Sequence, residues 1–267
     1  MVEIYIGLKA KHHPFGKKPW GSRDKYLNLH ADAKKKIYKE IDFFEEKKGY
    51  KIDRTWFEDL ALHTQVVIKN SELNYQHGRL LYSSLRNYLI TSKNETNDVV
   101  ILESGTARGF SSVCMAKALI DSNKGGKIFT IDILPHNKPI LWNCIDDHEG
   151  PKTRKDLLSK WSNEIKKIIF VQGHSRKRLP KMNLTRINFA FIDAMHEEED
   201  VLSEYRYVCQ KQKAGDIIIF DDVTPNLFEG VYRAVKKVEE ENIYRVERIT
   251  LSDQRGYAVA TKKINFS

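Results

Sequence analysis

The chain has 267 residues, of which 41% are hydrophobic and 30% charged, a balance ordinary for a globular protein with a substantial core. No apolar run is long enough to cross a bilayer, and the first residues lack the features of a signal peptide, so we expect a cytoplasmic protein. The net charge of +9 allows binding to nucleic acid, but the basic clusters at 9–18 and 174–181 lack the aromatic spacing of RNA-binding motifs. We therefore predict no specific nucleic-acid partner.

The three cysteines are scattered along the chain, and this indicates neither a disulfide framework nor a zinc site. The first ninety or so residues favour helices and loops over strands. Ile37, Ile41 and Phe44 recur at helical spacing and predict one amphipathic helix over 30–49 that ends at Gly49. A second apolar helical face predicts a helix over 76–92.

From Val99 onward, short apolar runs alternate with helical stretches, which is typical of repeated βαβ units. The predicted strands cover 99–104, 127–133, 167–173, 188–194 and 216–222. Because these runs are almost entirely apolar, we expect a mainly parallel, Rossmann-like doubly wound α/β sheet with helices on both faces. The segments 244–251 and 255–263 predict a C-terminal antiparallel hairpin. Ligands of such sheets bind beyond the carboxyl ends of the strands.

The first strand leads into the glycine-containing segment ESGTARGFSS. Gly105 and Gly109 allow a tight turn and a close approach to a ligand. The spacing differs from GxGxxG, and Glu103 would repel a pyrophosphate, so the segment suits a ligand that carries a positive charge or donates hydrogen bonds. Asp132 ends the second strand, where a carboxylate can accept both hydroxyls of a ribose; the alternative is that it caps the next turn.

Acidic side chains end two further strands, Asp193 after one and Asp221 with Asp222 after the next. A helix from about Glu198 to Gln212 connects them, so the two strands should be neighbours, about 4.8 Å apart. The three carboxylates would repel one another unless a hard divalent cation such as Mg²⁺ lay between them. The alternative is that Asp193 anchors a cofactor and the acidic pair caps a loop.

In this order, the motifs ESGTxxGxS, TIDI, FIDAMH and FDDV resemble the class I S-adenosylmethionine-dependent methyltransferases. More narrowly, they are similar to the metal-dependent O-methyltransferases, which include catechol and macrocin-type sugar O-methyltransferases. The resemblance covers about Tyr75 to the C-terminus. We therefore divide the chain into a helical extension at 1–74, a cap or substrate region, and a methyltransferase domain at 75–267.

The resemblance implies roles for individual residues. It assigns the methionine end of the cofactor to a loop, the ribose to the end of the second strand and the adenine to the loop after the third strand. It also implies that the segment 76–78 faces the cofactor or the substrate, although this segment can equally be a simple helix start. The implied cofactor-binding residues are Glu103, Gly105, Thr106, Gly109, Asp132, Ser175 and Asp193, and the implied metal ligands are Asp193, Asp221 and Asp222.

The catechol enzyme carries asparagine at the position of Asp222 and lysine at the position of His196, whereas the macrocin type carries histidine at the latter. His196 and Asp193 are therefore the predicted catalytic residues, with the imidazole as general base. The sequence predicts a Mg²⁺-dependent O-methyltransferase that acts on a hydroxyl of a sugar or glycosylated small molecule. Trp142, in the insertion-like segment 134–158, is a candidate for a lid.

Two other readings stay open. One is a non-catalytic binding protein on the same scaffold that recruits a polyanion through its basic N-terminal region; the other is a related hydroxylase-type enzyme of antibiotic tailoring. The acidic motifs and His196 favour catalysis. The acceptor, the hydroxyl that is methylated, the metal and the oligomeric state are not fixed by the sequence, which is compatible with a homo-oligomer.

Overall fold

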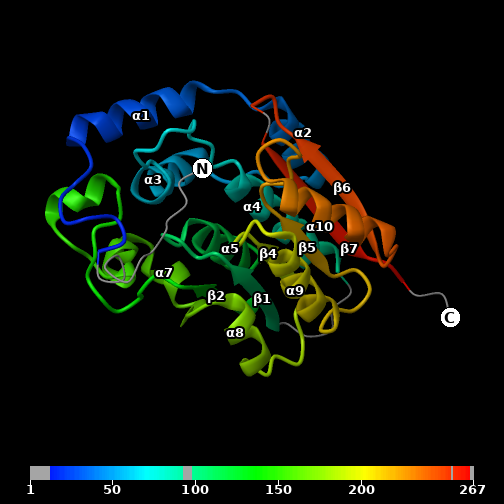
Figure 1. Ribbon diagram of the computed structural model, residues 1–267. Helices are drawn as coiled ribbons and strands as arrows, with labels where there is room; N and C mark the ends of the chain where they lie inside the picture. Colours follow the sequence, from blue (N-terminus) through cyan, green and yellow to red (C-terminus); the bar gives the residue numbers. More distant parts are fainter. Residues whose placement is uncertain (1–12, 93–97, 254, 265–267) are drawn as a thin grey trace.

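A seven-stranded sheet with the order β3-β2-β1-β4-β5-β7-β6 forms the centre of the molecule (Figure 1). The computed structural model describes residues 13–92, 98–253 and 255–264. The strands are β1 Asp98–Ser104, β2 Gly125–Asp132, β3 Ile168–Gln172, β4 Phe189–Ile192, β5 Ile217–Phe220, β6 Tyr244–Thr250 and β7 Gly256–Lys262. The strands β1 to β5 pair in parallel, and β7 pairs antiparallel with β5 and β6. The predicted sheet and C-terminal hairpin are confirmed.

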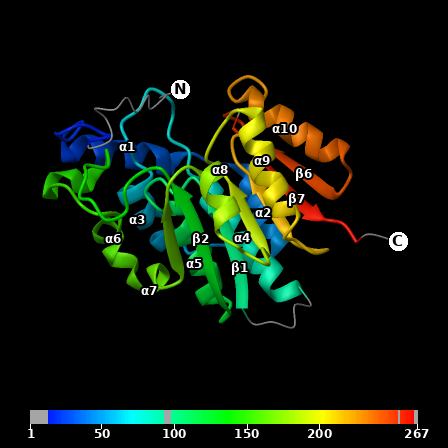
Figure 2. The ribbon, with the colours of Figure 1, turned by 60° about the horizontal axis from the view of Figure 1, so that its bottom comes forward.

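Helices cover both faces of this sheet (Figure 2). They are α1 Arg23–Lys35, α2 Lys39–Lys48, α3 Arg54–Thr64, α4 His77–Thr91, α5 Phe110–Asp121, α6 Arg154–Leu157, α7 Ser162–Ile165, α8 Ser175–Arg178, α9 Glu198–Cys209 and α10 Glu229–Glu240, with 3₁₀ turns η1 Ile145–Glu149, η2 Ser159–Trp161 and η3 Leu179–Lys181. Successive residues of β4 alternate between the faces: Phe189 and Phe191 pack in the core with α4 and α5, whereas Ala190 and Ile192 pack with α9 and α10. None of the described helices is long and apolar enough to cross a membrane.

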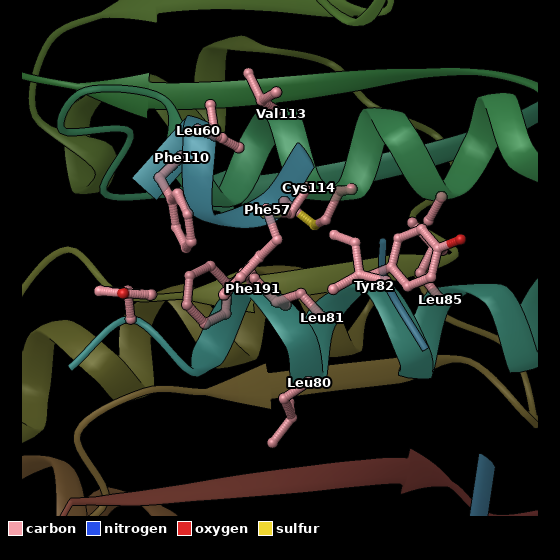
Figure 3. Close-up of a cluster of buried hydrophobic side chains, with 14 of the residues drawn as sticks. Phe57, Leu60, Leu80, Leu81, Tyr82, Leu85, Phe110, Val113, Cys114 and Phe191 are labelled. Carbon is pink, nitrogen blue, oxygen red and sulfur yellow. The ribbon is translucent and has the colours of Figure 1, made fainter. Parts of the chain in front are cut away.

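The N-terminal helices pack against the same core as α4 and α5. Phe57 and Leu60 of α3 lie in one buried cluster with Leu81, Phe110 and Phe191 (Figure 3). The helices α1 to α3 therefore share the core on the α4 and α5 face of the sheet, instead of forming a core of their own. The division of the chain near residue 74 stays a prediction.

The single helix predicted over 30–49 is wrong, because the chain forms two helices, α1 and α2, with a break between them. Lys36 is extended, and Ile37 is 72% exposed instead of buried. Tyr38 after the break is buried, and its hydroxyl donates to Asp253. The burial and contact of Tyr38 favour a break at this point, whereas the local hydrophobic spacing alone favours a continuous helix. The predicted end at Gly49 is correct, with φ at 81°.

Candidate active site

The loops after β1, β4 and β5 lie side by side at one edge of the sheet. Ser104 pairs with Ile192, and Ile192 pairs with Phe220, so the residues that follow them are level with one another. The backbone N–H of Asp193 donates to Ser104 O at 3.0 Å, and that of Asp221 donates to Ile192 O at 3.2 Å. The predicted adjacency of the two acidic motifs is therefore correct.

A pocket opens at the ends of β1 to β4. Its lining residues are Gly105, Ile131, Asp132, Ile133, Gly173, His174, Ser175, Ala194 and Met195. Three residues that the sequence assigned to a cofactor, Gly105, Asp132 and Ser175, thus surround one space, which we name the cofactor pocket after this prediction. The carboxylate of Asp132 accepts the N–H groups of Ala107 at 2.6 Å and Leu134 at 2.7 Å. Because each carboxylate oxygen has two lone pairs, both can still accept a hydroxyl.

Other residues that the sequence assigned to the cofactor lie behind the pocket. Glu103 is fully buried, and its carboxylate accepts hydrogen bonds from Ser111, Ser112 and Thr130. Burial raises the pKa of Glu103. Its carboxylate therefore ties β1 to the start of α5 beneath the loop, and a direct contact with a cofactor stays a prediction.

Thr106 and Gly109 shape the same loop. The Thr106 hydroxyl is buried and pairs with that of Thr130 at 2.5 Å. Gly109 precedes α5 with φ at 91°, and a Cβ there would lie 2.6 Å from Leu158 Cδ1. Both residues hold the loop in place, and neither lines the pocket. Trp142 is fully buried against Phe15 and does not present a free face as a lid would.

Gly105 is the point where the β1 loop touches the β4 loop. Its φ is +95°, and a Cβ would lie 2.2 Å from the carbonyl oxygen of Asp193. Only glycine combines this backbone conformation with so close an approach. The cofactor pocket and the acidic residues are therefore held together by a direct backbone contact.

We expect Gly105→Ala to destabilise the protein by about 2 to 5 kcal/mol, because strain at positive φ adds to overpacking against backbone. Gly215→Ala is the matched control, since Gly215 has φ at +88° but nothing within 4 Å of an added Cβ. Urea unfolding of the two variants would separate the clash from the strain. Equal loss of stability in both would contradict the close packing of the two loops.

An acidic cluster, defined here as Asp193, His196 and Asp222, lies beside the cofactor pocket. One potential ligand atom from each of these residues lies within 4.8 Å of the others. This group shares Asp193 and Asp222 with the predicted ligands Asp193, Asp221 and Asp222, and that ligand assignment stays a prediction. Asp222 adopts φ at +57°, and its carboxylate contacts His196 Nε2 at 3.2 Å, whereas that of Asp221 turns to His77 Nδ1 at 3.8 Å. The two consecutive carboxylates therefore point apart, and Asp221 lies outside this group.

The carboxylates of this edge differ in their electrostatics. Burial and the charges of Asp221 and Asp222 raise the pKa of Asp193 well above its usual range. Burial and the charge of Asp222 raise the pKa of Asp221 to about 8. Burial also acts to raise the pKa of Asp222, but the hydrogen bond from His196 and the charge of Arg255 outweigh it, so this pKa is lowered. Ionising all three carboxylates at once therefore requires additional positive charge.

Two basic residues from distant segments supply part of this charge, and neither was among the predicted site residues. Arg255, in the β6–β7 turn, donates from Nη1 to Asp222 Oδ1 at 2.8 Å. Lys69 lies between α3 and α4; burial lowers its pKa to about 8, with further effects from the charges of Arg255 and Asp222. Neither residue lies in a recognisable motif. The tertiary fold brings each of them to this site, and a local sequence pattern does not reveal such a position.

His77, in the segment 76–78, lies at the same edge of the sheet as Asp221, and a contact of this segment with a cofactor or substrate stays a prediction. Its ring stacks on Phe191 with centroids 6.0 Å apart and meets the edge of Phe110 at 5.1 Å. Burial lowers the pKa of His77 to about 4, so its imidazole is neutral at pH 7. A neutral ring beside Asp221 suits a positioning role.

Glu204, on α9, is a further buried carboxyl group beneath the cofactor pocket. Ser104 donates to its Oε2 at 2.5 Å, and the side chain of Ser175, which lines the pocket, also interacts with it. Burial raises the pKa of Glu204 to about 7. The hydroxyl groups at the ends of β1 and β3 are thereby linked to a group that titrates near neutrality.

We expect the free energy of unfolding to fall by about 1 kcal/mol between pH 6 and pH 8 through Glu204 alone. The folded pKa lies above the unfolded value, so this contribution is present at low pH and lost as pH rises through 7. Glu204→Gln should remove this part of the pH dependence, and Glu46→Gln, at an exposed position, should not. Urea unfolding at both pH values provides the measurement, and an unchanged slope in Glu204→Gln would contradict the assignment.

Comparisons with known proteins agree with this arrangement. Residues 102–223 match a family model described as a methyltransferase domain. The matched segment runs from β1 to the loop after β5 and so includes the cofactor pocket and the acidic cluster. No curated protein sequence matches the chain.

Solved structures share the fold at low sequence identity. Cofactor-bound Rv0187 from MTB has a TM-score of 0.57 and 17% identity, with 80% of this chain and 92% of that chain covered. The O-methyltransferase TomG from Streptomyces achromogenes, in complex with SAM, has a TM-score of 0.55 and 17% identity, with 80% of this chain and 91% of that chain covered. The O-methyltransferase from Bacillus cereus, in complex with SAH, has a TM-score of 0.55 and 16% identity, with 79% of this chain and 92% of that chain covered.

Residues 102–223 therefore match a methyltransferase domain, and they lie in a sheet of the Rossmann-like type. The resemblance to the class I S-adenosylmethionine-dependent methyltransferases is therefore confirmed.

Proposed function

We propose that the protein is a Mg²⁺-dependent O-methyltransferase that transfers a methyl group from S-adenosylmethionine to a hydroxyl of a sugar or glycosylated small molecule. The observation that carries this proposal is the position of the acidic cluster directly beside the cofactor pocket. Asp193 belongs to the cluster, and the next two residues, Ala194 and Met195, line the pocket. A methyl donor in the pocket and an activated hydroxyl at the cluster would then be neighbours.

S-adenosylmethionine suits the pocket for two reasons. Asp132 presents a carboxylate with free acceptor capacity at the end of β2, which matches the two hydroxyls of a ribose. The solved structures of TomG and of the Bacillus cereus enzyme contain SAM or SAH, and both proteins are O-methyltransferases with this fold. Gly105 and Ser175 complete the proposed contacts.

The donor atoms of the acidic cluster fit a hard divalent cation. Asp193 and Asp222 supply carboxylate oxygens, the ligand type that Mg²⁺ prefers, and the cluster lies among carboxylates whose repulsion a cation would relieve. Asp193 and Asp222 would hold the ion, with Asp221 in the surrounding layer. When bound, Mg²⁺ lowers the pKa of a hydroxyl that it coordinates.

A second pocket next to the cluster could hold the acceptor. It has a volume of about 260 Å³ and is lined by Ser71, Glu72, Leu227, Ser252, Asp253 and Arg255. Arg255 links it to the cluster through its hydrogen bond to Asp222. Five of the six lining side chains are polar, which suits an acceptor with several hydroxyls. We name this space the acceptor pocket.

We propose that His196 removes the proton of the acceptor hydroxyl. Its side chain is 47% exposed, its ring packs on Phe228 with centroids 4.3 Å apart, and Nε2 lies 3.2 Å from Asp222 Oδ2. The carboxylate and the aromatic ring orient the imidazole, while its exposure leaves it accessible. A positioned imidazole is the commonest general base in enzymes.

Incubation with radiolabelled S-adenosylmethionine and a panel of acceptor sugars, with and without chelator, tests the proposal. We expect chelator-sensitive labelling of at least one sugar or glycoside. Tight binding of NADH without binding of S-adenosylhomocysteine would overturn the assignment of the cofactor.

A further inference from the structure

A third pocket lies among the N-terminal helices, away from the cofactor pocket. Five basic side chains line it, namely Lys34, Lys36, Lys51, Arg54 and Arg79. Its volume is about 330 Å³, which is within the range of small-molecule sites. We name it the basic pocket.

Three of the five basic side chains of the basic pocket form ion pairs, Lys36 with Glu72, Arg54 with Glu58 and Arg79 with two carboxylates, and among the described residues the other two form none. Asp42 and Glu45 also line it, but both carboxylates are bonded to the buried guanidinium of Arg79, with Arg79 Nη2 at 2.6 Å from Asp42 Oδ1. Lys34 and Lys51 are exposed, and neither forms an ion pair within the part of the chain that the structure describes. An anion with more than one charge would therefore be attracted to this pocket.

The basic pocket adjoins the acceptor pocket through two contacts. Tyr38, on the basic side, donates its hydroxyl hydrogen to Asp253, on the acceptor side, at 3.4 Å. Lys36 Nζ lies 2.6 Å from Glu72 Oε2 across the same boundary. Figure 1 shows α2 next to the β6–β7 hairpin, in agreement with these contacts. One ligand could therefore occupy both pockets, with its reactive hydroxyl near Asp222.

We propose that the basic pocket binds a phosphate or diphosphate group of the acceptor, so that the substrate is a phosphorylated or nucleotide-linked sugar and not a neutral one. This inference rests on the proposed function for the identity of the ligand, but not for the binding of the anion. Several cations around one pocket favour a multiply charged phosphate over a single carboxylate. The apolar side chains of Ile37 and Ile52 in the wall suit a small molecule better than a nucleic-acid backbone.

Binding of inorganic pyrophosphate to the full chain tests the pocket without any assay of activity. We expect calorimetry in metal-free buffer to detect binding, and Lys34→Glu/Lys51→Glu to weaken it about tenfold. Lys127→Glu/Lys166→Glu is the matched control: it reverses two charges at exposed lysines in β2 and just before β3, outside the three pockets, and should leave the affinity unchanged. Absence of pyrophosphate binding, equal weakening in both variants, or binding of an RNA oligonucleotide in preference to pyrophosphate would overturn the proposal.

A second measurement separates this inference from the proposed function. With methyl transfer as the readout, a sugar phosphate should have a KM about tenfold below that of the unphosphorylated sugar, and Lys34→Glu/Lys51→Glu should remove the difference. Equal KM values for the two acceptors would refute the inference while the methyltransferase function stands. Pyrophosphate binding without methyl transfer to any acceptor would instead support the basic pocket and refute the proposed function.

Discussion

Replacing His196 by alanine is expected to lower the turnover of methyl transfer by about 10² to 10⁴ fold, the usual contribution of a positioned general base. The metal concentration required for activity should stay the same. The residual activity should rise with pH, because hydroxide from solvent then removes the proton. Measurements of kcat against pH and of activity against Mg²⁺ concentration, in the variant and the parent, test both statements.

The measurement also decides between two roles for His196. A nitrogen of its ring lies close enough to the carboxylates of Asp193 and Asp222 to be a metal ligand, but imidazole suits softer ions better than Mg²⁺. A ligand role predicts that His196→Ala raises the metal requirement, whereas a base role predicts that it does not. His148→Ala, at an exposed position outside the three pockets, is the control. Full turnover in His196→Ala would leave the imidazole with no catalytic role.

The features that the sequence predicted correctly are those that depend on local patterns. The strands β1 to β5 are short, apolar runs, because helices cover them on both faces. The adjacency of Asp193 and Asp221 follows from the length of one connection between parallel strands. The placement of Asp132 beside Gly105 follows because the carboxyl ends of parallel strands share one edge.

The features that were not predicted depend on contacts between distant segments. The break between α1 and α2 is fixed by Tyr38 and Asp253, which are 215 positions apart. Arg255 reaches Asp222 from the β6–β7 turn, and Lys69 comes from a loop of the N-terminal region. Hydrophobic periodicity carries no information about such pairs.

The side-chain directions of Asp221 and Asp222 show a different limit of sequence reasoning. Both were expected to face one ion, but the left-handed backbone of Asp222 turns its carboxylate to His196 and Arg255. One dihedral angle therefore decides which of two consecutive carboxylates joins the acidic cluster. Asparagine and aspartate tolerate this conformation better than most residues, yet the sequence Asp-Asp does not indicate which one adopts it.

Removal of the divalent metal is expected to abolish methyl transfer while leaving the binding of S-adenosylhomocysteine largely intact. The cofactor pocket is built from Gly105, Asp132, Ser175 and the residues that follow Asp193, and its lining does not include Asp222 or His196. Calorimetry in the presence of EDTA would measure cofactor binding, and added Mg²⁺ should restore the activity. Activity that persists in excess chelator would show that the acidic cluster acts without a metal.

The variants Asp222→Asn and Asp221→Asn test which of the two carboxylates binds the metal. Asp222 has a lowered pKa and belongs to the acidic cluster, so its loss removes a charged ligand and should raise the half-saturating Mg²⁺ concentration by about tenfold or more. The pKa of Asp221 is raised to about 8, so in the metal-free protein at pH 7 it is mostly protonated and asparagine resembles it closely. Asp221→Asn should therefore change the metal requirement less. If Asp221→Asn had the larger effect, the ion would lie between Asp193 and Asp221, two of the three ligands that the sequence predicted, and Asp222 would instead anchor His196 and Arg255.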